Sequence, residues 1–260
     1  SLIMSIRFAL AALIMGLLSF KDFKQLDKKT LFHGSIAGLF LFFAFYVQTL
    51  GQKYTSVSNA AFLTATNVVM IPFIVWAISK KRPLVKTFIL ATTTLLGIAV
   101  LTLKIGQNIS FNAGDLLILL CALLFALHIA YLGIFSAGLN AKLLTFMQLA
   151  VAAIFSLGIL FIVDFSSITA EVLQKGIFPS VYLALFSTCL CYFMQTKAQQ
   201  YIAPGKAGII LCMEGLFGSI FSVVLGLDIL TMNLVVGGLI IITSVMLSEA
   251  NIGFKKKEHI

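Results

Sequence analysis

The chain has 260 residues, of which 60% belong to the hydrophobic set and only 10% are charged, and its formal net charge is +9. Its mean hydropathy of +1.09 is far above that of a soluble domain, in which about 25% of residues are charged. These values exclude a soluble globular protein. Apolar runs such as 116–127 lack the alternation of a membrane β-barrel, so an all-α membrane protein is predicted.

Apolar runs between short polar breaks predict nine membrane-spanning helices, because a span needs roughly 17–25 apolar residues. In chain order they cover about 1–20, 31–52, 57–79, 84–104, 114–135, 141–163, 177–199, 204–226 and 231–250. Pro83, Pro179 and Pro204 are expected in the first turns of three of them. The pattern Gly34-x-x-x-Gly38 in the second predicts close helix packing.

The basic residues separate the two ends of these helices. Alternate loops place Lys53, Lys104 and Lys175 on one side and fourteen bases on the other: Lys21, Lys24, Lys28, Lys29, Lys80, Lys81, Arg82, Lys86, Lys142, Lys197, Lys206, Lys255, Lys256 and Lys257. The richer side is expected to be cytoplasmic, with the C-terminus inside and the protein in a cell membrane such as the bacterial inner membrane. Nine spans that end inside begin outside, so a tenth span is expected before Ser1.

An internal repeat organises the chain. The pattern Q-T-x-x-Q-x-Y at residues 48–54 recurs 147 residues later, at 195–201. The two copies fall on opposite sides of the membrane, as an odd number of spans per repeat requires. We therefore predict two inverted five-helix repeats, 1–107, which lacks its first helix, and 108–260. Inverted repeats place a binding site near the bilayer midplane, where the halves meet.

Several segments resemble a known family. The runs 114–117 and 122–126, the span that contains Ala152, and the segment Tyr201-x-x-Pro204 look like the second half of an EamA-like drug/metabolite transporter. The resemblance covers essentially the whole chain. It implies ten spans in two inverted five-span repeats and the transport of small metabolites, often outward.

Glu214 is the clearest candidate site residue. It lies ten residues into the span that starts at Pro204, about 15 Å deep, where a charged group costs at least ~2.5–3.5 kcal/mol. Its repeat mate, Asn67, lies equally deep in the third span. Helical spacing places Asn59, Thr66 and Asn67 on one face, and the matching face carries Lys206, Met213 and Glu214.

These two faces are predicted to line a central cavity, in which Glu214 binds a cationic substrate group or takes up a coupling proton. The alternative for Glu214 is a structural ion pair or hydrogen bond. His128 could share a proton with Glu214 or be a neutral histidine bonded to a carbonyl. Arg7, which matches Gln148 in the repeat, could meet an anionic substrate group or extend to the outer surface.

Gln48 and Gln195 fall near opposite mouths of the expected pathway, where gate contacts and helix-to-helix hydrogen bonds explain them equally well. Cys121, Cys189, Cys191 and Cys212 all lie inside apolar spans without metal-ligand spacing, so neither a metal nor a cofactor is expected. The bases are scattered over short loops and form no nucleic-acid-binding face.

The sequence thus predicts a secondary transporter of small organic metabolites that works by alternating access. One form of this prediction is an exporter coupled to protons. Its partners would be a small-molecule substrate, membrane lipids and protons, and the oligomeric state stays open. A channel or facilitator without ion coupling is the alternative. An intramembrane enzyme is less favoured, because neither H-E-x-x-H nor G-x-S-x-G occurs.

Overall fold

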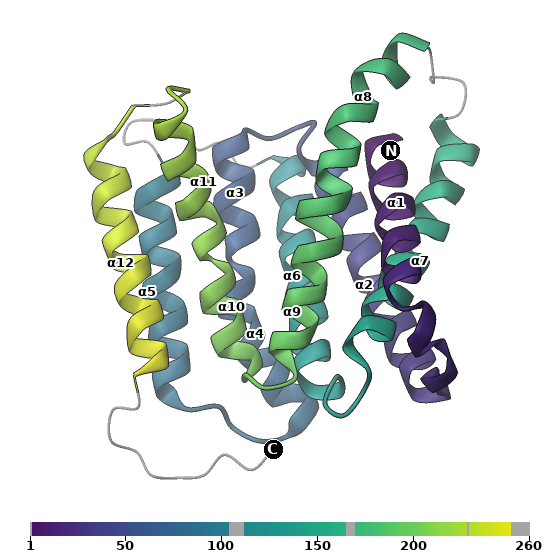
Figure 1. Ribbon diagram of the computed structural model, residues 1–260. Helices are drawn as coiled ribbons and strands as arrows, with labels where there is room; N and C mark the ends of the chain where they lie inside the picture. The colour runs from purple at the N-terminus through teal and green to yellow at the C-terminus, as the bar shows by residue number, and fades with distance from the viewer. Residues whose placement is uncertain (1, 104–111, 165–169, 228, 251–260) are drawn as a thin grey trace.

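The computed structural model describes residues 2–103, 112–164, 170–227 and 229–250, and within these ranges all regular structure is helical. Eight helical segments are long and apolar enough to cross a membrane, and Leu2–Leu18 is a shorter apolar helix. The helices run roughly along one common direction (Figure 1). Their outer faces are apolar, with Ile154 66% exposed and Leu116 61% exposed. The all-α membrane fold is therefore confirmed.

The helices in chain order are α1 (Leu2–Leu18), η1 (Phe20–Gln25), α2 (Lys28–Gly51), α3 (Val57–Ala65), α4 (Asn67–Ser79), α5 (Val85–Thr102), α6 (Ala113–Phe135), α7 (Ala141–Ile159), η2 (Leu160–Asp164), α8 (Ala170–Tyr182), η4 (Leu183–Leu190), α9 (Cys191–Gln199), α10 (Pro204–Leu211), α11 (Met213–Val224) and α12 (Met232–Glu249). The segment η1 is a 3-10 helix, and η2 and η4 are π-helical.

One of the three prolines lies where the sequence predicted. Pro204 is the first residue of α10, where its missing N–H costs nothing. Pro83 precedes α5, which begins at Val85. The prediction for Pro179 was wrong, because α8 begins at Ala170 and contains this proline. The π-helical turns of η4 follow it, a widened geometry that accommodates interrupted helical hydrogen bonds.

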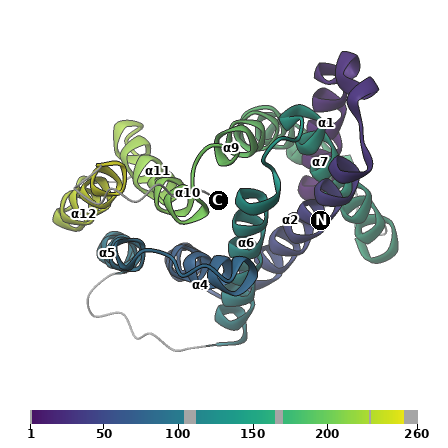
Figure 2. The same ribbon diagram turned by 90° about the horizontal axis from the view of Figure 1, so that it is seen from below.

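Seen along the helices, the bundle has two sides with α6 between them (Figure 2). On one side α5 packs on α12 and on α4, and α10 packs on α4. On the other side α2 packs on α7, α7 packs on α1, and α1 packs on α8 and η4. The helix α6 contacts α2 on one flank and α4 on the other, so it joins the two sides.

The contact between α2 and α7 depends on small residues. A Cβ atom on Gly38 would lie 2.6 Å from the carbonyl oxygen of Gln148, and one on Gly34 would lie 2.5 Å from Cβ of Met147. Only glycine permits helices to approach so closely. The packing role predicted for Gly34-x-x-x-Gly38 is confirmed.

The two halves of the span that contains α10 and α11 differ in how tightly they pack. Pro204 lies against Gly133 of α6, and Gly205 and Gly208 of α10 lie against Thr87 and Ile71. In α11, by contrast, a Cβ atom added to Gly215 or to Gly218 would meet nothing within 4 Å. The helix α10 is therefore enclosed at its glycines, whereas the glycine face of α11 is open and Leu216, elsewhere on α11, is buried against Gly238 of α12.

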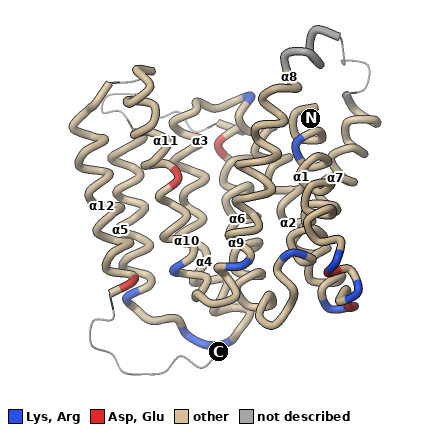
Figure 3. Tube along the Cα trace, in the orientation of Figure 1, with Lys and Arg blue, Asp and Glu red and all other residues tan. Residues whose placement is uncertain are grey.

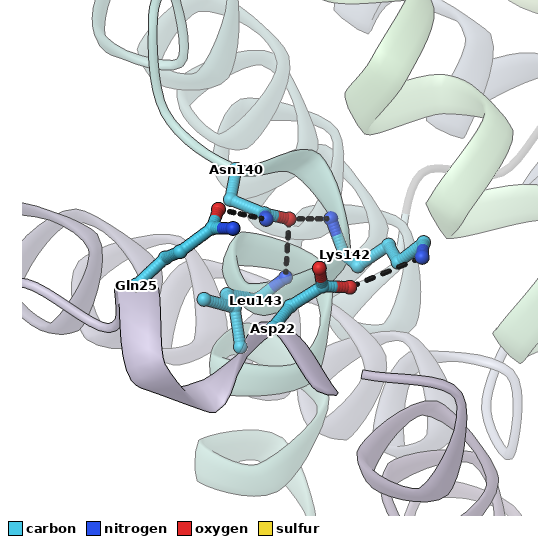
Figure 4. Close-up of polar contacts among 5 residues, drawn as sticks. All are labelled: Asp22, Gln25, Asn140, Lys142 and Leu143. Atoms are coloured by element: carbon cyan, nitrogen blue, oxygen red, sulfur yellow. Dashed lines mark hydrogen bonds and ion pairs between the residues drawn. The ribbon is translucent and has the colours of Figure 1, made fainter. Parts of the chain in front are cut away.

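A polar cluster attaches η1 to the start of α7 (Figure 4). The Asn140 side chain caps α7 by accepting hydrogen bonds from the backbone of Lys142 (3.0 Å) and Leu143 (3.3 Å), and it donates to Gln25 (3.1 Å). The ammonium group of Lys142 lies 3.0 Å from the carboxylate of Asp22. Such caps satisfy the N–H groups that a helix start leaves unpaired.

The helix α2, which follows η1 in the chain, starts with a cap of the same kind as that of α7. The Asp27 carboxylate accepts a hydrogen bond of 2.8 Å from the backbone of Thr30. Hydrogen bonds from the side chain and backbone of Thr30 lower the pKa of Asp27 below its ordinary value. The polar segment between α1 and α2 thus ends in a defined helix cap.

Charged residues gather at one end of the bundle, the lower end in Figure 3. The described lysines and arginines at the helix termini of that end are Lys21, Lys24, Lys28, Lys29, Lys80, Lys81, Arg82, Lys86, Lys142, Lys197 and Lys206. Lys104 and Lys255–Lys257 lie outside the described residues, as does the side chain of Lys175. We refer to this end as the basic end.

Candidate functional site

Two spans have a one-residue irregularity near their middle, and two predicted site residues follow it closely. The helix α3 ends at Ala65 and α4 begins at Asn67, while α10 ends at Leu211 and α11 begins at Met213 with Glu214 as its second residue. The backbone ψ is −16° at Thr66 and −15° at Cys212. Each span still forms one apolar segment long enough to cross a membrane, Val57–Ser79 and Pro204–Val224, as the sequence predicted.

The backbone at both positions stays in the right-handed helical region, with φ of −60° at Thr66 and −63° at Cys212. Each irregularity is therefore a tightened turn within a span.

The structure brings the two irregularities together. Ala65, at the end of α3, and Met213, at the start of α11, pack against one apolar cluster made of Ile98, Leu216, Leu234 and Ile241. Cys212 also packs against a second cluster, which contains Val68 from the start of α4. The segments in which Asn67 and Glu214 lie therefore share a core.

The other residues of the two predicted faces have separate surroundings. The Thr66 hydroxyl donates to the Leu63 carbonyl (2.6 Å). The Lys206 ammonium lies 3.9 Å from the Glu249 carboxylate, at the basic end. Asn59 and Asn67 are half-buried, and no hydrogen bond joins either side chain to another described residue.

Arg7 is directed into the bundle. Its Nε donates to the Thr188 hydroxyl (2.6 Å), and its guanidinium carbon lies 4.4 Å from the centre of the Phe45 ring. A cation over an aromatic face is worth about 0.5–2 kcal/mol. Arg7 thus joins α1 to α2 and η4.

His128 is completely buried and belongs to a chain of side-chain hydrogen bonds. Its Nε2 lies 2.9 Å from Oε1 of Gln148, whose amide group donates to the Thr196 hydroxyl (2.8 Å). Because the amide oxygen only accepts, Nε2 carries the proton in this arrangement. Its Nδ1 has no hydrogen-bond partner among the described residues, and the ring packs edge-on against Tyr192 at 5.9 Å.

The two glutamines of the repeated pattern differ in their contacts. The Gln195 amide donates weakly to Gln199 (3.4 Å), which in turn donates to the Ile129 carbonyl (3.0 Å). Gln48 is half-buried, and its side chain makes no hydrogen bond within the described chain. Gln195 thus belongs to the contact of α9 with α6.

The sequence did not identify Tyr192, whose ring packs against those of His128 and Phe45, with centres 5.9 and 6.4 Å away. The guanidinium of Arg7 lies over the same Phe45 ring. Glu214 of α11 is exposed. Thr188 and Gln148 were not selected either, although a glutamine inside an apolar span is itself a signal of a polar contact.

Neither of two surface hollows is lined by these residues. The larger, about 590 Å³, is at the basic end beside Asp22 and Lys142, and the smaller, about 90 Å³, includes Tyr46 and Lys53. In the described ranges, His, Cys, Asp and Glu form no group of three that could hold a metal ion. The candidate site residues are Asn67 and Glu214, which follow the two irregularities, and Arg7 and Tyr192, which lie against Phe45.

Comparisons with known proteins agree on the kind of protein. The sequence model of the EamA-like transporter family matches residues 2–103 and 112–249. An uncharacterized transporter of Archaeoglobus fulgidus is 33% identical over 248 residues, which cover 94% of this chain and 74% of that protein. A crystal structure with 14% identity has the same fold, with a TM-score of 0.78 over 95% of this chain and 86% of the other.

Proposed function

The chain belongs to the EamA-like transporter family, and we propose that it is a secondary transporter that moves small organic solutes across a cell membrane by alternating access. One observation carries the proposal. Each half of the chain contains a span with a one-residue irregularity, at Thr66 and at Cys212, and Asn67 and Glu214, which are 147 positions apart, lie one and two residues after it.

Two inverted repeats, 1–107 and 108–260, account for this correspondence. In such an architecture the two halves exchange conformations, so a site at their junction opens alternately to either side. The bases at one end of the bundle support a cytoplasmic location for that end and for the C-terminus. The membrane is then the cytoplasmic membrane.

Glu214 is the residue to which we assign the central role. It binds a cationic group of the solute or takes up a coupling proton, and Asn67, Thr66 and Asn59 line the pathway beside it. Arg7 and His128 extend the pathway towards α1 and α6. Gln48 and Gln195 are assigned to its two mouths. The second candidate is a facilitator without ion coupling, in which the same residues bind the solute alone.

Counterflow in proteoliposomes tests the proposal. Vesicles that contain the purified protein are preloaded with unlabelled amino acids, nucleosides, sugars or cationic drugs, and uptake of the same labelled solute is followed. Since a carrier exchanges solutes one for one, we expect labelled solute to accumulate transiently above its equilibrium level. Uptake that rises only to equilibrium with every preload would identify a channel.

Glu214→Gln tests the assigned residue in the same vesicles, with the exposed acid Glu249→Gln as the matched control. We expect Glu214→Gln to lower counterflow at least tenfold and to remove its dependence on pH, while Glu249→Gln leaves both unchanged. Undiminished and still pH-dependent counterflow in Glu214→Gln would overturn the role of this residue.

A further inference from the structure

The larger surface hollow lies at the basic end, beside the point where the chain leaves α1. Its volume is about 590 Å³, and it is lined by three apolar and three charged side chains: Leu17, Leu18, Phe20, Lys21, Asp22 and Lys142. This volume falls within the roughly 300–1,000 Å³ of small-molecule sites. None of the residues assigned to transport lines it, so the hollow calls for an explanation of its own.

The lining changes from apolar to charged along the chain. Leu17 and Leu18 are the last residues of α1, and both are exposed. Phe20, which is 76% exposed, and Lys21 follow in η1, the short connection to α2. Because α1 and α2 belong to the membrane-spanning bundle, η1 lies at the boundary between hydrocarbon and water. The apolar part of the hollow therefore borders lipid chains, and its charged part lies at the level of the headgroups.

The segment η1 is held firmly against α7. Phe23 packs edge-on against Phe146 of α7, with ring centres 5.1 Å apart. Asp22 makes the ion pair of 3.0 Å with Lys142 that Figure 4 shows. One wall of the hollow comes from the end of α1 and from η1, and the other comes from the first turn of α7. These contacts keep the two walls in place relative to each other.

The ammonium groups of the hollow retain donors for a ligand. Lys21 is exposed and makes no hydrogen bond or ion pair with any described residue. Lys142 uses one of its three N–H donors on Asp22. Since the lining contains two lysines and one aspartate, one unit of positive charge remains in excess. A ligand with a single negative charge complements this set.

We propose that the hollow binds an anionic phospholipid, with its phosphate on Lys21 and Lys142 and with its glycerol backbone and first acyl-chain carbons on the three apolar side chains. Basic pockets at the ends of membrane helices recognise anionic headgroups in this way. The phosphate diester of phosphatidylglycerol carries one negative charge and no cation, which matches the excess charge. Phosphatidylcholine would bring its own cation beside the same lysines, and like charges repel.

Quenching of a tryptophan by brominated lipid tests this site. Phe20→Trp in a Trp76→Phe background places the single tryptophan in the hollow, because the sequence contains no other. The full chain is reconstituted in phosphatidylcholine vesicles that contain brominated phosphatidylglycerol or brominated phosphatidylcholine at the same low mole fraction. We expect an association constant 5- to 25-fold higher for phosphatidylglycerol, since each lysine near an anionic lipid contributes about fivefold.

Two comparisons show whether the preference belongs to the hollow. Lys21→Gln should lower it about fivefold. Lys24→Gln is the matched control, because Lys24 lies on η1 but does not line the hollow, and it should leave the preference unchanged. A reporter at the opposite end of the bundle, Leu116→Trp in the same Trp76→Phe background, should be quenched equally by both lipids. Helical circular dichroism shows that each variant is folded.

Three results would overturn the lipid assignment. The first is equal quenching by both lipids at position 20. The second is an equal loss of preference in Lys21→Gln and Lys24→Gln, which would indicate a diffuse attraction by the whole basic end. The third is loss of the preference when millimolar glycerol phosphate is added, which would identify a soluble phosphate ester as the ligand. Solute counterflow enters none of these measurements, so the transport proposal stands or falls separately.

Discussion

The imidazole of His128 has two ring nitrogens in a fully buried position, and Gln148 satisfies one of them. A buried polar atom that loses its partner costs about 1–3 kcal/mol, whereas removal of both partners can be nearly neutral. The bond between His128 and Gln148 is thus a feature whose energy can be measured by a pair of substitutions.

We predict that Gln148→Leu lowers the free energy of unfolding by about 1–2 kcal/mol, because both the His128 and Thr196 side chains lose their partner. The double variant with His128→Leu should recover part of this loss. Unfolding in mixed micelles measures both, and Gln48→Leu, which removes a glutamine without a side-chain hydrogen bond, is the control. Strictly additive effects of the two substitutions would contradict the prediction.

The polarity of single residues indicated part of the site. Arg7, His128 and Glu214 stand out in an apolar sequence, because each has a cost in the membrane that demands a partner or a function. Thr188 and Tyr192 do not stand out. Threonine satisfies its own hydroxyl within a helix, as Thr94 does here with the Leu90 carbonyl, so its presence in a span says nothing about a long-range contact.

Among the helices, α2 and α7 have the contact most sensitive to side-chain size. We predict that Gly38→Ala lowers the free energy of unfolding by about 1–3 kcal/mol, the usual cost of overpacking, since the new methyl group would meet the Gln148 carbonyl oxygen. Unfolding in mixed micelles measures the loss.

Gly158→Ala, on α7, is the matched control. A Cβ atom there would meet nothing within 4 Å, so this variant should be as stable as the wild type or slightly more stable, because alanine favours a helix over glycine. Equal stability of the two variants would show that α2 and α7 are not in close contact.

The helices themselves could be predicted, because the length of an apolar run determines a span. Their one-residue irregularities could not. Neither Thr66 nor Cys212 is a glycine or a proline, so nothing at these positions indicates a tightened turn. The reverse error occurred at Pro179, which lies inside a helix whose π-helical continuation accommodates it.

For the whole molecule, the distribution of bases predicts which side faces the cytoplasm. In a variant whose native cysteines are replaced by alanine, we expect Lys80→Cys to react with an impermeant maleimide only after the cells are opened. Lys53→Cys, at the opposite end, should react in intact cells. The measurement is the fraction labelled before and after permeabilisation, and the opposite pattern would invert the orientation.

The order of the helices around the bundle could not be predicted from the chain. The pairing of α5 with α12 and the position of α6 between the two sides arise from side-chain packing, and apolar faces carry little information about their partners because lipid is as apolar as a neighbouring helix. The internal repeat predicted that the two halves of the chain correspond in sequence, but it did not predict which helices pack against one another.

The unequal packing of α10 and α11 has a mechanical consequence. Since α10 is enclosed by α4, α5 and α6 near its glycines, a displacement of this span would begin at Cys212 and move only its second half. Such a hinge at half depth would carry Glu214 with the moving segment while the basic end keeps its contacts.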